Sequence, residues 1–237
     1  MLDVGCGDGL IGLGALERGA SVIFSDISQA CLDDCRAIAG PDAEYLLADA
    51  TALGPMEADV VTVRSVLIYV DDKEKAFAEF FRVLRPGGRL SIFEPINRFG
   101  AADRRRTFGG LDVGGVEGLV ARVLSEIERA EEAAGGLRSM TDFGEYDLFE
   151  AAEAAGFETV RLETVAERKP EPMIATRDWD TFLRSAPNPI SPTLGEAAER
   201  ALSPDEFAQL TAVLRPQVEA GRGVSRFASC FLAARKS

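Results

Sequence analysis

The chain has 237 residues, of which 46% are apolar, which is enough to bury the core of one α/β domain with an insertion. Its formal net charge of −13 argues against a nucleic-acid partner, because phosphate binding depends on Lys and Arg. The one compact basic run, the three arginines at 104–106, is interpreted as solvated. No apolar run approaches the roughly 20 residues of a membrane span, and we expect no secretory signal, because the sequence opens directly on a predicted strand and a glycine-rich turn. We therefore expect a cytoplasmic protein without a membrane partner.

The cysteines and the missing histidine bear on which metal sites and general bases the chain can form. Of four cysteines, Cys31 and Cys35 are four residues apart on a predicted helix, and there is no second close pair. Without histidine, a zinc site or other metal site is not expected, and free thiols in a reducing compartment are the simpler interpretation. The absence of histidine also removes the commonest general base near neutral pH.

Short runs of β-branched and aliphatic residues alternate with helical runs along the first 170 residues. Such runs are typical of strands that are buried on both faces of a parallel sheet. Ser28 and either Asp71 or Asp72 are expected to cap two of the helices. The alternation predicts an α/β fold with a doubly wound, mostly parallel sheet and right-handed crossovers. The predicted strands are 2–4, 21–25, 44–48, 59–63, 89–93, 157–164 and 225–234, and the predicted helices are 10–18, 28–38, 73–84 and 146–155.

Two stretches, 100–140 and 170–222, interrupt this alternation. Neighbouring strands at the end of such a sheet are normally joined by a short loop, so the insertions need a reason. We expect them to form a substrate cap within a single domain of residues 1–237; a dimerisation surface and simple packing are the alternatives. Trp179 and the turn at 187–189 would close over the substrate, unless Trp179 is a core anchor. The helices predicted in the insertions are 116–134, 193–202 and 204–219.

Glycines and carboxylates gather where the first three strands end. The segment Asp3-Val4-Gly5-Cys6-Gly7-Asp8-Gly9 joins the first strand to the first helix, where glycines let the backbone approach a ligand. Asp26 ends the second strand, where a carboxylate can accept hydrogen bonds from both ribose hydroxyls of a nucleoside. Asp49 ends the third strand and is followed by Ala50. Open α/β sheets bind ligands in the crevice at these strand ends, so a nucleoside-containing ligand is predicted there.

These motifs, with Arg82-Val83-Leu84-Arg85-Pro86-Gly87-Gly88, resemble those of class I S-adenosylmethionine-dependent methyltransferases over residues 1–95. The resemblance implies a Rossmann-like fold with strand order 3-2-1-4-5-7-6 and the last strand antiparallel. It also implies S-adenosylmethionine as the cofactor, S-adenosylhomocysteine as the product and a small-molecule methyl acceptor. The implied cofactor-binding residues are Asp3, Gly5, Cys6 and Gly7 for the methionine part, Asp26 for the ribose, Ile27, Asp49 and Ala50 for the adenine, and the Arg64 backbone for the methionine amine.

The front of the chain departs from the family pattern. Family members carry tens of residues before the first strand, whereas here Met1 lies within that strand. Either the insertions have taken over the covering role, or the natural start lies upstream, which is the explanation we favour. A nicotinamide-dependent dehydrogenase is disfavoured, because Leu10 replaces the third glycine of a G-x-G-x-x-G fingerprint and the chain has no histidine to serve in hydride chemistry.

The residues that bind and activate the methyl acceptor are expected in the segments that follow the fourth and fifth predicted strands. Methyl transfer from a sulfonium needs no strong base when the acceptor is an amine, a thiolate or an enolate. For a hydroxyl acceptor, Glu94 and Tyr69 are the candidate catalytic bases, although core packing and a local ion pair are alternative roles. A non-catalytic cofactor-binding module and a protein methyltransferase remain the competing functions, and a homodimer is compatible with the sequence. The expected substrate-binding residues are Ser65, Tyr69, Asn97, Arg98 and Trp179.

Overall fold

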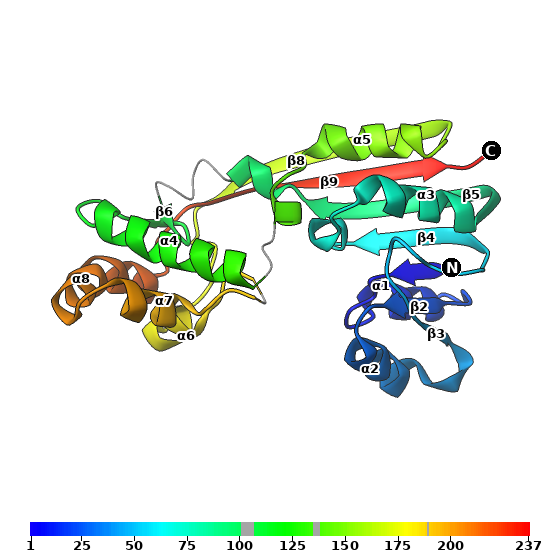
Figure 1. The fold of residues 1–237 in the computed structure, drawn as a ribbon. Coiled ribbons are helices and arrows are strands. Elements are labelled where there is room, and N and C mark those ends of the chain that lie inside the picture. The colour runs from blue at the N-terminus through cyan, green and yellow to red at the C-terminus, as the bar shows by residue number, and fades with distance from the viewer. Residues whose placement is uncertain (101–106, 135–137, 189) are drawn as a thin grey trace. The chain divides into compact units, whose positions relative to one another are not determined.

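The computed structural model describes residues 1–100, 107–134, 138–188 and 190–237 (Figure 1). The arginine run at 104–106 lies outside the described residues. The chain forms two compact units, each assembled from separate segments. The first, here called the sheet unit, comprises Met1–Arg98, Ser139–Val165 and Ser229–Ser237. The second, here called the helical unit, comprises Phe99–Arg138 and Ala166–Ala228.

A seven-stranded sheet has the order β3-β2-β1-β4-β5-β9-β8 (Figure 1). Strands β1 to β5 pair in parallel, and β9 pairs antiparallel with β5. Both the order and the reversed strand were expected from the sequence, so the Rossmann-like fold class is confirmed. The strands are β1 (Leu2–Val4), β2 (Ile23–Asp26), β3 (Glu44–Leu47), β4 (Ala58–Arg64), β5 (Leu84–Pro95), β8 (Thr159–Lys169) and β9 (Ser225–Arg235).

The middle of this sheet is apolar because its central strands are covered on both faces. All three residues of β1 are buried, and Leu2 is in register with Ile23 of β2 and Val61 of β4. Burial along the whole strand is typical of the central strands of a parallel sheet, and the polar residue within β1, Asp3, is buried as well. The residues that follow the strands are thereby brought to one edge of the sheet.

Local capping signals set the ends of the helices in the sheet unit. The Ser28 side chain accepts the Cys31 N–H at the start of α2, and the Asp72 side chain accepts the Lys75 N–H at the start of α3. Both caps were predicted. Helix α3 packs against α5, and Lys236 near the C-terminus donates through Nζ to the Phe81 and Leu84 carbonyls, both at 2.7 Å. The helices are α1 (Leu10–Leu16), α2 (Gln29–Ala39), α3 (Lys73–Val83) and α5 (Glu145–Ala154).

Strand β5 is longer than the predicted strand at 89–93. Helix α3 ends at Val83, and residues 85–88 lie inside β5 as an irregularity: Ala58 pairs with Leu84, and pairing then resumes between Val60 and Arg89. The extension exists because Gly87 and Gly88 exchange backbone hydrogen bonds with Lys236. This partner comes from the far end of the chain, so local sequence could not reveal it.

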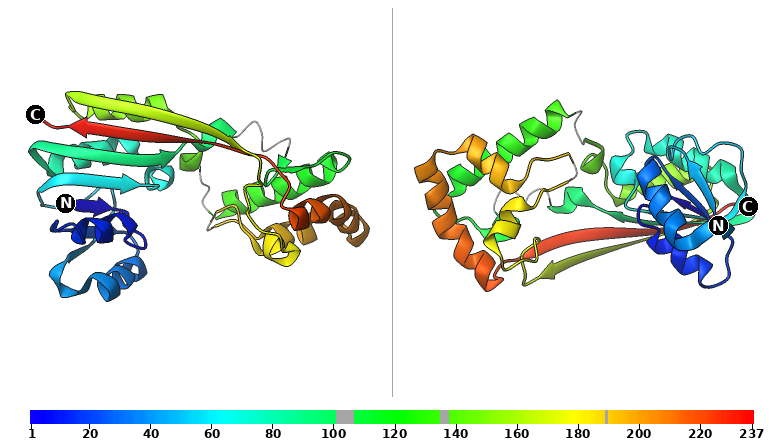
Figure 2. Two further views of the ribbon diagram at one scale, coloured as in Figure 1. Left: turned by 180° about the vertical axis from the view of Figure 1, so that it is seen from behind. Right: turned by 90° about the horizontal axis from the view of Figure 1, so that it is seen from below.

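The two insertions come together in the helical unit, which has its own core. Helix α4 contacts α7, and α7 contacts α6 and α8, as the two views of Figure 2 show. Trp179 is 7% exposed and stacks on Phe182 with ring centroids 5.4 Å apart, so it is a core anchor of this unit. That the unit covers a substrate stays a prediction. Its elements are β6 (Thr107–Phe108), β7 (Leu111–Asp112), α4 (Glu117–Ala133), α6 (Trp179–Arg184), α7 (Leu194–Ala201) and α8 (Pro204–Ala220).

Candidate functional site

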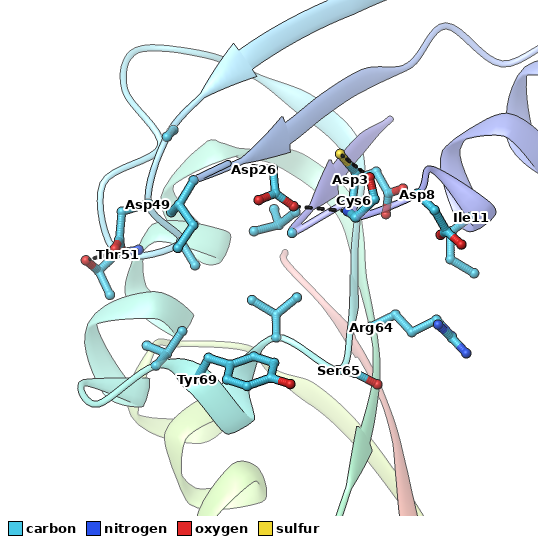
Figure 3. A pocket seen from close by; sticks show the side chains of 18 of the residues that line it. Asp3, Cys6, Asp8, Ile11, Asp26, Asp49, Thr51, Arg64, Ser65 and Tyr69 are labelled. Atoms are coloured by element: carbon cyan, nitrogen blue, oxygen red, sulfur yellow. Dashed lines mark hydrogen bonds between the residues drawn. The ribbon is translucent and has the colours of Figure 1, made fainter. Parts of the chain in front are cut away.

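A pocket of about 600 Å³ lies within the sheet unit where β1, β2, β3 and β4 end (Figure 3). Its volume falls in the range of small-molecule sites. Every residue that the sequence predicted to bind the cofactor contributes to its lining. These residues are Asp3, Gly5, Cys6, Gly7, Asp26, Ile27, Asp49, Ala50 and Arg64.

The turn after β1 owes its shape to glycines. Gly5, Gly7 and Gly9 all have positive φ angles, between 52° and 81°, which side chains with a Cβ rarely adopt. A Cβ on Gly5 would lie 2.3 Å from Val66 Cγ2, whereas one on Gly7 would meet no atom within 4 Å. Gly5 is therefore needed for packing as well as for conformation, and the space beside Gly7 is left for a ligand.

Asp3 holds this corner of the sheet together. One carboxylate oxygen accepts the Thr62 hydroxyl at 2.7 Å, and the other accepts the Gly12 N–H at 2.9 Å. Burial raises the pKa of Asp3, and these two hydrogen bonds oppose the shift. Asp3 thus ties β1 to β4 and to α1 underneath the glycine turn.

Asp26 and Asp49 lie along the upper side of the pocket in Figure 3. Asp26 accepts the Gly7 N–H through Oδ2 at 3.0 Å and the Ser28 N–H through Oδ1 at 2.9 Å, so it also fastens the glycine turn to β2. Each carboxylate oxygen has a second lone pair, so Asp26 can accept further hydrogen bonds from a ligand. Asp49 Oδ1 accepts the Thr51 hydroxyl and N–H, both at 2.7 Å, and these bonds lower the pKa of Asp49.

The wall between Asp26 and Asp49 is partly apolar. The Ile27 side chain is 72% exposed, although it is large and aliphatic, and Ala50 is small and buried. Apolar side chains in the lining of a pocket can pack against a planar ring.

The segment after β4 forms the opposite wall, with Ser65 and Tyr69 facing Asp26 across the pocket (Figure 3). Ser65 has φ 55°, and it is the residue other than glycine found at positive φ among those described. Tyr69 ends a 3₁₀ turn, Leu67–Tyr69, and is 49% exposed. Both were predicted to face the acceptor, and the structure brings both into the pocket.

Glu94, the other predicted base, is not part of the pocket lining. Its side chain is 0% exposed, and its Oε1 accepts the N–H groups of Val66 at 2.8 Å and Leu67 at 2.9 Å. Burial raises the pKa of Glu94 to about 7. The carboxyl group therefore sits behind the pocket wall, and the geometry does not support direct proton transfer with an acceptor.

Three further predicted substrate contacts are also missing from the pocket lining. Asn97 and Arg98 lie in the 3₁₀ turn Asn97–Gly100 after β5, and Trp179 lies in the core of the helical unit. That these three residues bind the substrate stays a prediction.

Sequence reasoning missed several residues that do line the pocket. Leu10 and Ile11 begin α1 and keep exposed apolar side chains there, while Asp8, Asp71 and Asp72 add negative charge at the rim. Six aspartates and one arginine, Arg64, line the pocket in total, so the site favours a cationic ligand. The signal was available: Asp71 and Asp72 follow the segment after β4, but capping alone explained them. The other lining residues are Val4, Ala48, Thr51, Val66 and Val70.

Comparison with known proteins matches residues 2–92 to a family model described as a methyltransferase domain. A ubiquinone biosynthesis O-methyltransferase of Pseudomonas entomophila (strain L48) is 36% identical over 104 residues, 41% of this chain and 44% of the relative. The matched region is thus less than half of the relative's length.

Two solved structures share the fold at low sequence identity. A candidate methyltransferase of Bacillus halodurans C-125 has a TM-score of 0.56 at 19% identity, over 99% of this chain and 91% of its own. Phosphoethanolamine N-methyltransferase 2 of Haemonchus contortus, in complex with S-adenosyl-L-methionine, has a TM-score of 0.52 at 19% identity, over 100% of this chain and 48% of its own. Residues 2–92 thus match a methyltransferase domain, and the observed strand order agrees with the order that the resemblance to class I S-adenosylmethionine-dependent methyltransferases implied.

Proposed function

We propose that the protein transfers the methyl group of S-adenosylmethionine to a small-molecule acceptor, with S-adenosylhomocysteine as the product. The observation that carries this proposal is the grouping of Asp26, Asp49 and the glycine turn on one pocket, where three strands end. Each was singled out in the sequence for a different part of the same cofactor. An unrelated role for these residues would not require them to share one cavity.

The residues present fit this cofactor. Asp26 has lone pairs left for ribose hydroxyls, and Ile27 and Ala50 offer an apolar surface for adenine. The open space beside Gly7 suits the methionine part. The excess of aspartates in the lining favours the positive charge of the sulfonium. Asp3 maintains the turn from beneath, so it contributes through structure.

When bound, the cofactor would supply an activated methyl group with a good leaving group. The chain's contribution is then to hold the acceptor in line, and orientation of this kind lowers barriers by up to about 7–11 kcal/mol. Ser65 and Tyr69 are placed to orient the acceptor, because they face the cofactor side of the pocket. Tyr69 is the remaining candidate for handling a hydroxyl proton, since Glu94 lies behind the wall.

The relatives' O-methyltransferase activity makes hydroxyl-bearing small molecules the first acceptors to test. The exposed apolar side chains of Leu10, Ile11 and Tyr69 at the pocket are compatible with an apolar or aromatic acceptor. The test is production of S-adenosylhomocysteine from S-adenosylmethionine with panels of phenols, amines and thiols. Turnover with any small-molecule panel supports the proposal. Tight cofactor binding without turnover on any panel would favour a non-catalytic binding module instead.

The absence of a nucleic-acid partner, the cytoplasmic location and homodimer formation stay predictions. The described part of the chain contains no helix with the length and apolarity to cross a membrane. It also contains no group of three or more Cys, Asp or Glu side chains arranged to hold a metal ion.

A further inference from the structure

The loop that forms one wall of the pocket is held by hydrogen bonds to the end of β5. Three successive N–H groups after β4 point to that strand: Ser65 donates to the Phe93 carbonyl at 2.9 Å, and Val66 and Leu67 donate to Glu94 Oε1. The last two are N–H groups at the start of a 3₁₀ turn, which has no partner for them of its own. One side chain therefore accepts both of these N–H groups.

Glu94 is an unusual residue for this place unless its carboxyl group has a role. The side chain is fully buried, and its second oxygen, Oε2, has no hydrogen-bond partner among the described residues. Burying a carboxyl group costs free energy, and an apolar residue would suit the strand better if packing were the only requirement. Unlike an apolar residue, Glu94 supplies an oxygen atom that accepts hydrogen bonds from the N–H groups of Val66 and Leu67.

The loop is coupled in turn to the glycine-rich segment on the other side. Val66 packs so closely on Gly5 that a Cβ there would lie within 2.3 Å of it. Ser65, immediately before Val66, is held at φ 55°, where residues other than glycine are strained. Without the hydrogen bonds to Glu94, the loop would be able to relax this strain, and Val66 would then no longer pack against Gly5.

We propose that Glu94 is a positioning residue for the methyltransferase site: its carboxyl oxygen fixes the Ser65–Val66–Leu67 loop against Gly5 and so sets the pocket wall that the cofactor contacts. This inference rests on the proposed function and gives Glu94 a task other than proton transfer. It predicts that the hydrogen-bond acceptor matters more than the ionisable group.

The test is calorimetric binding of S-adenosylhomocysteine to wild type, Glu94→Met and Glu94→Gln. Methionine fills the space of Glu94 without a comparable acceptor. The Kd of Glu94→Met for S-adenosylhomocysteine is expected to rise at least about tenfold, because two buried N–H groups lose their partner. Glutamine keeps an acceptor oxygen and is expected to stay within about threefold of wild type. The matched control is Ile92→Ala, a buried change two residues earlier on β5, which should lower the melting temperature and leave the Kd unchanged.

The outcomes separate the two proposals. Absence of binding to wild type would refute the proposed function itself. Binding to wild type with no loss in Glu94→Met, or with equal losses in the methionine and glutamine variants, would overturn the positioning role. If Glu94→Met does not fold, hydrogen exchange of wild type decides: the Val66 and Leu67 amides should exchange far more slowly than the exposed Asp71 amide, and similar rates would overturn the inference.

Discussion

Glu94 should make the stability of this protein depend on pH in a direction that is unusual for a carboxyl group. Burial raises its pKa from the ordinary 4.5 to about 7, although the N–H groups of Leu67 and Val66 and the charge of Lys73 act in the opposite direction. Between these two pH values the folded protein keeps a proton that the unfolded chain has released. Folding stability is therefore lost as pH rises from 4.5 to 7.

The size of the effect follows from the shift. One pKa unit corresponds to about 1.4 kcal/mol, so a shift of this size makes Glu94 contribute about 3 kcal/mol at pH 4.5 that is absent above pH 7. Glu94→Gln removes the ionisation while keeping a similar shape. Since every other titrating group is shared, the difference in unfolding free energy between the two proteins isolates the contribution of Glu94.

The assay is urea unfolding of wild type and Glu94→Gln at half-unit steps from pH 5 to pH 8. The unfolding free energy of the variant minus that of wild type should increase by up to about 2–3 kcal/mol as pH rises through this range. This change is expected for any value of the difference at pH 5. Parallel stability curves across the range would refute the reasoning, because they would mean that Glu94 does not bind a proton in this window.

Three other predictions use separate features of the sheet unit. Gly12→Ala should destabilise the protein by at least about 2 kcal/mol in thermal unfolding, because a Cβ there would lie 2.2 Å from the buried Phe24 ring. The control is Gly14→Ala in the same helix, whose Cβ would meet only the flexible end of the Arg18 side chain at 3.6 Å. This variant should be more stable than wild type by up to about 1 kcal/mol. A larger loss in the Gly14 variant would contradict this. Iodoacetamide should label Cys31 first in native protein by peptide mass spectrometry, because the other three cysteines are buried and burial raises their pKa; early labelling elsewhere would count against the described packing. Lys236→Met should cost about 1–3 kcal/mol in urea unfolding by leaving two carbonyls without their donor, and an unchanged midpoint would show that these bonds add little.

The cofactor half of the site was predictable because its signals are local. The glycine turn, Asp26 and Asp49 each sit at the end of a strand, and parallel strands deliver their ends to one edge of the sheet. Capping signals likewise placed the start of α2 at Ser28 and the start of α3 at Asp71 or Asp72, and Asp72 is the cap that the structure shows.

The acceptor half was harder because direction and distance are set by tertiary structure. Tyr69 follows β4 and Glu94 lies near the end of β5, yet Tyr69 lines the pocket and Glu94 accepts hydrogen bonds from the rear of the loop. Position in sequence gives the strand end and does not give the side on which a buried polar group finds its partners. Trp179 fell in the core of the helical unit, since a large aromatic side chain gains most from burial.

The central claim is tested most directly by titrating S-adenosylhomocysteine into wild type, Asp26→Ala and Asp33→Ala in a calorimeter. Asp33 is an exposed aspartate paired with Arg36 on α2 and serves as the matched control. We expect micromolar binding to wild type and Asp33→Ala, and a loss of affinity of at least about tenfold in Asp26→Ala, because hydrogen bonds to a charged acceptor are removed. Absence of binding to folded wild type, or equal binding to all three proteins, would contradict it.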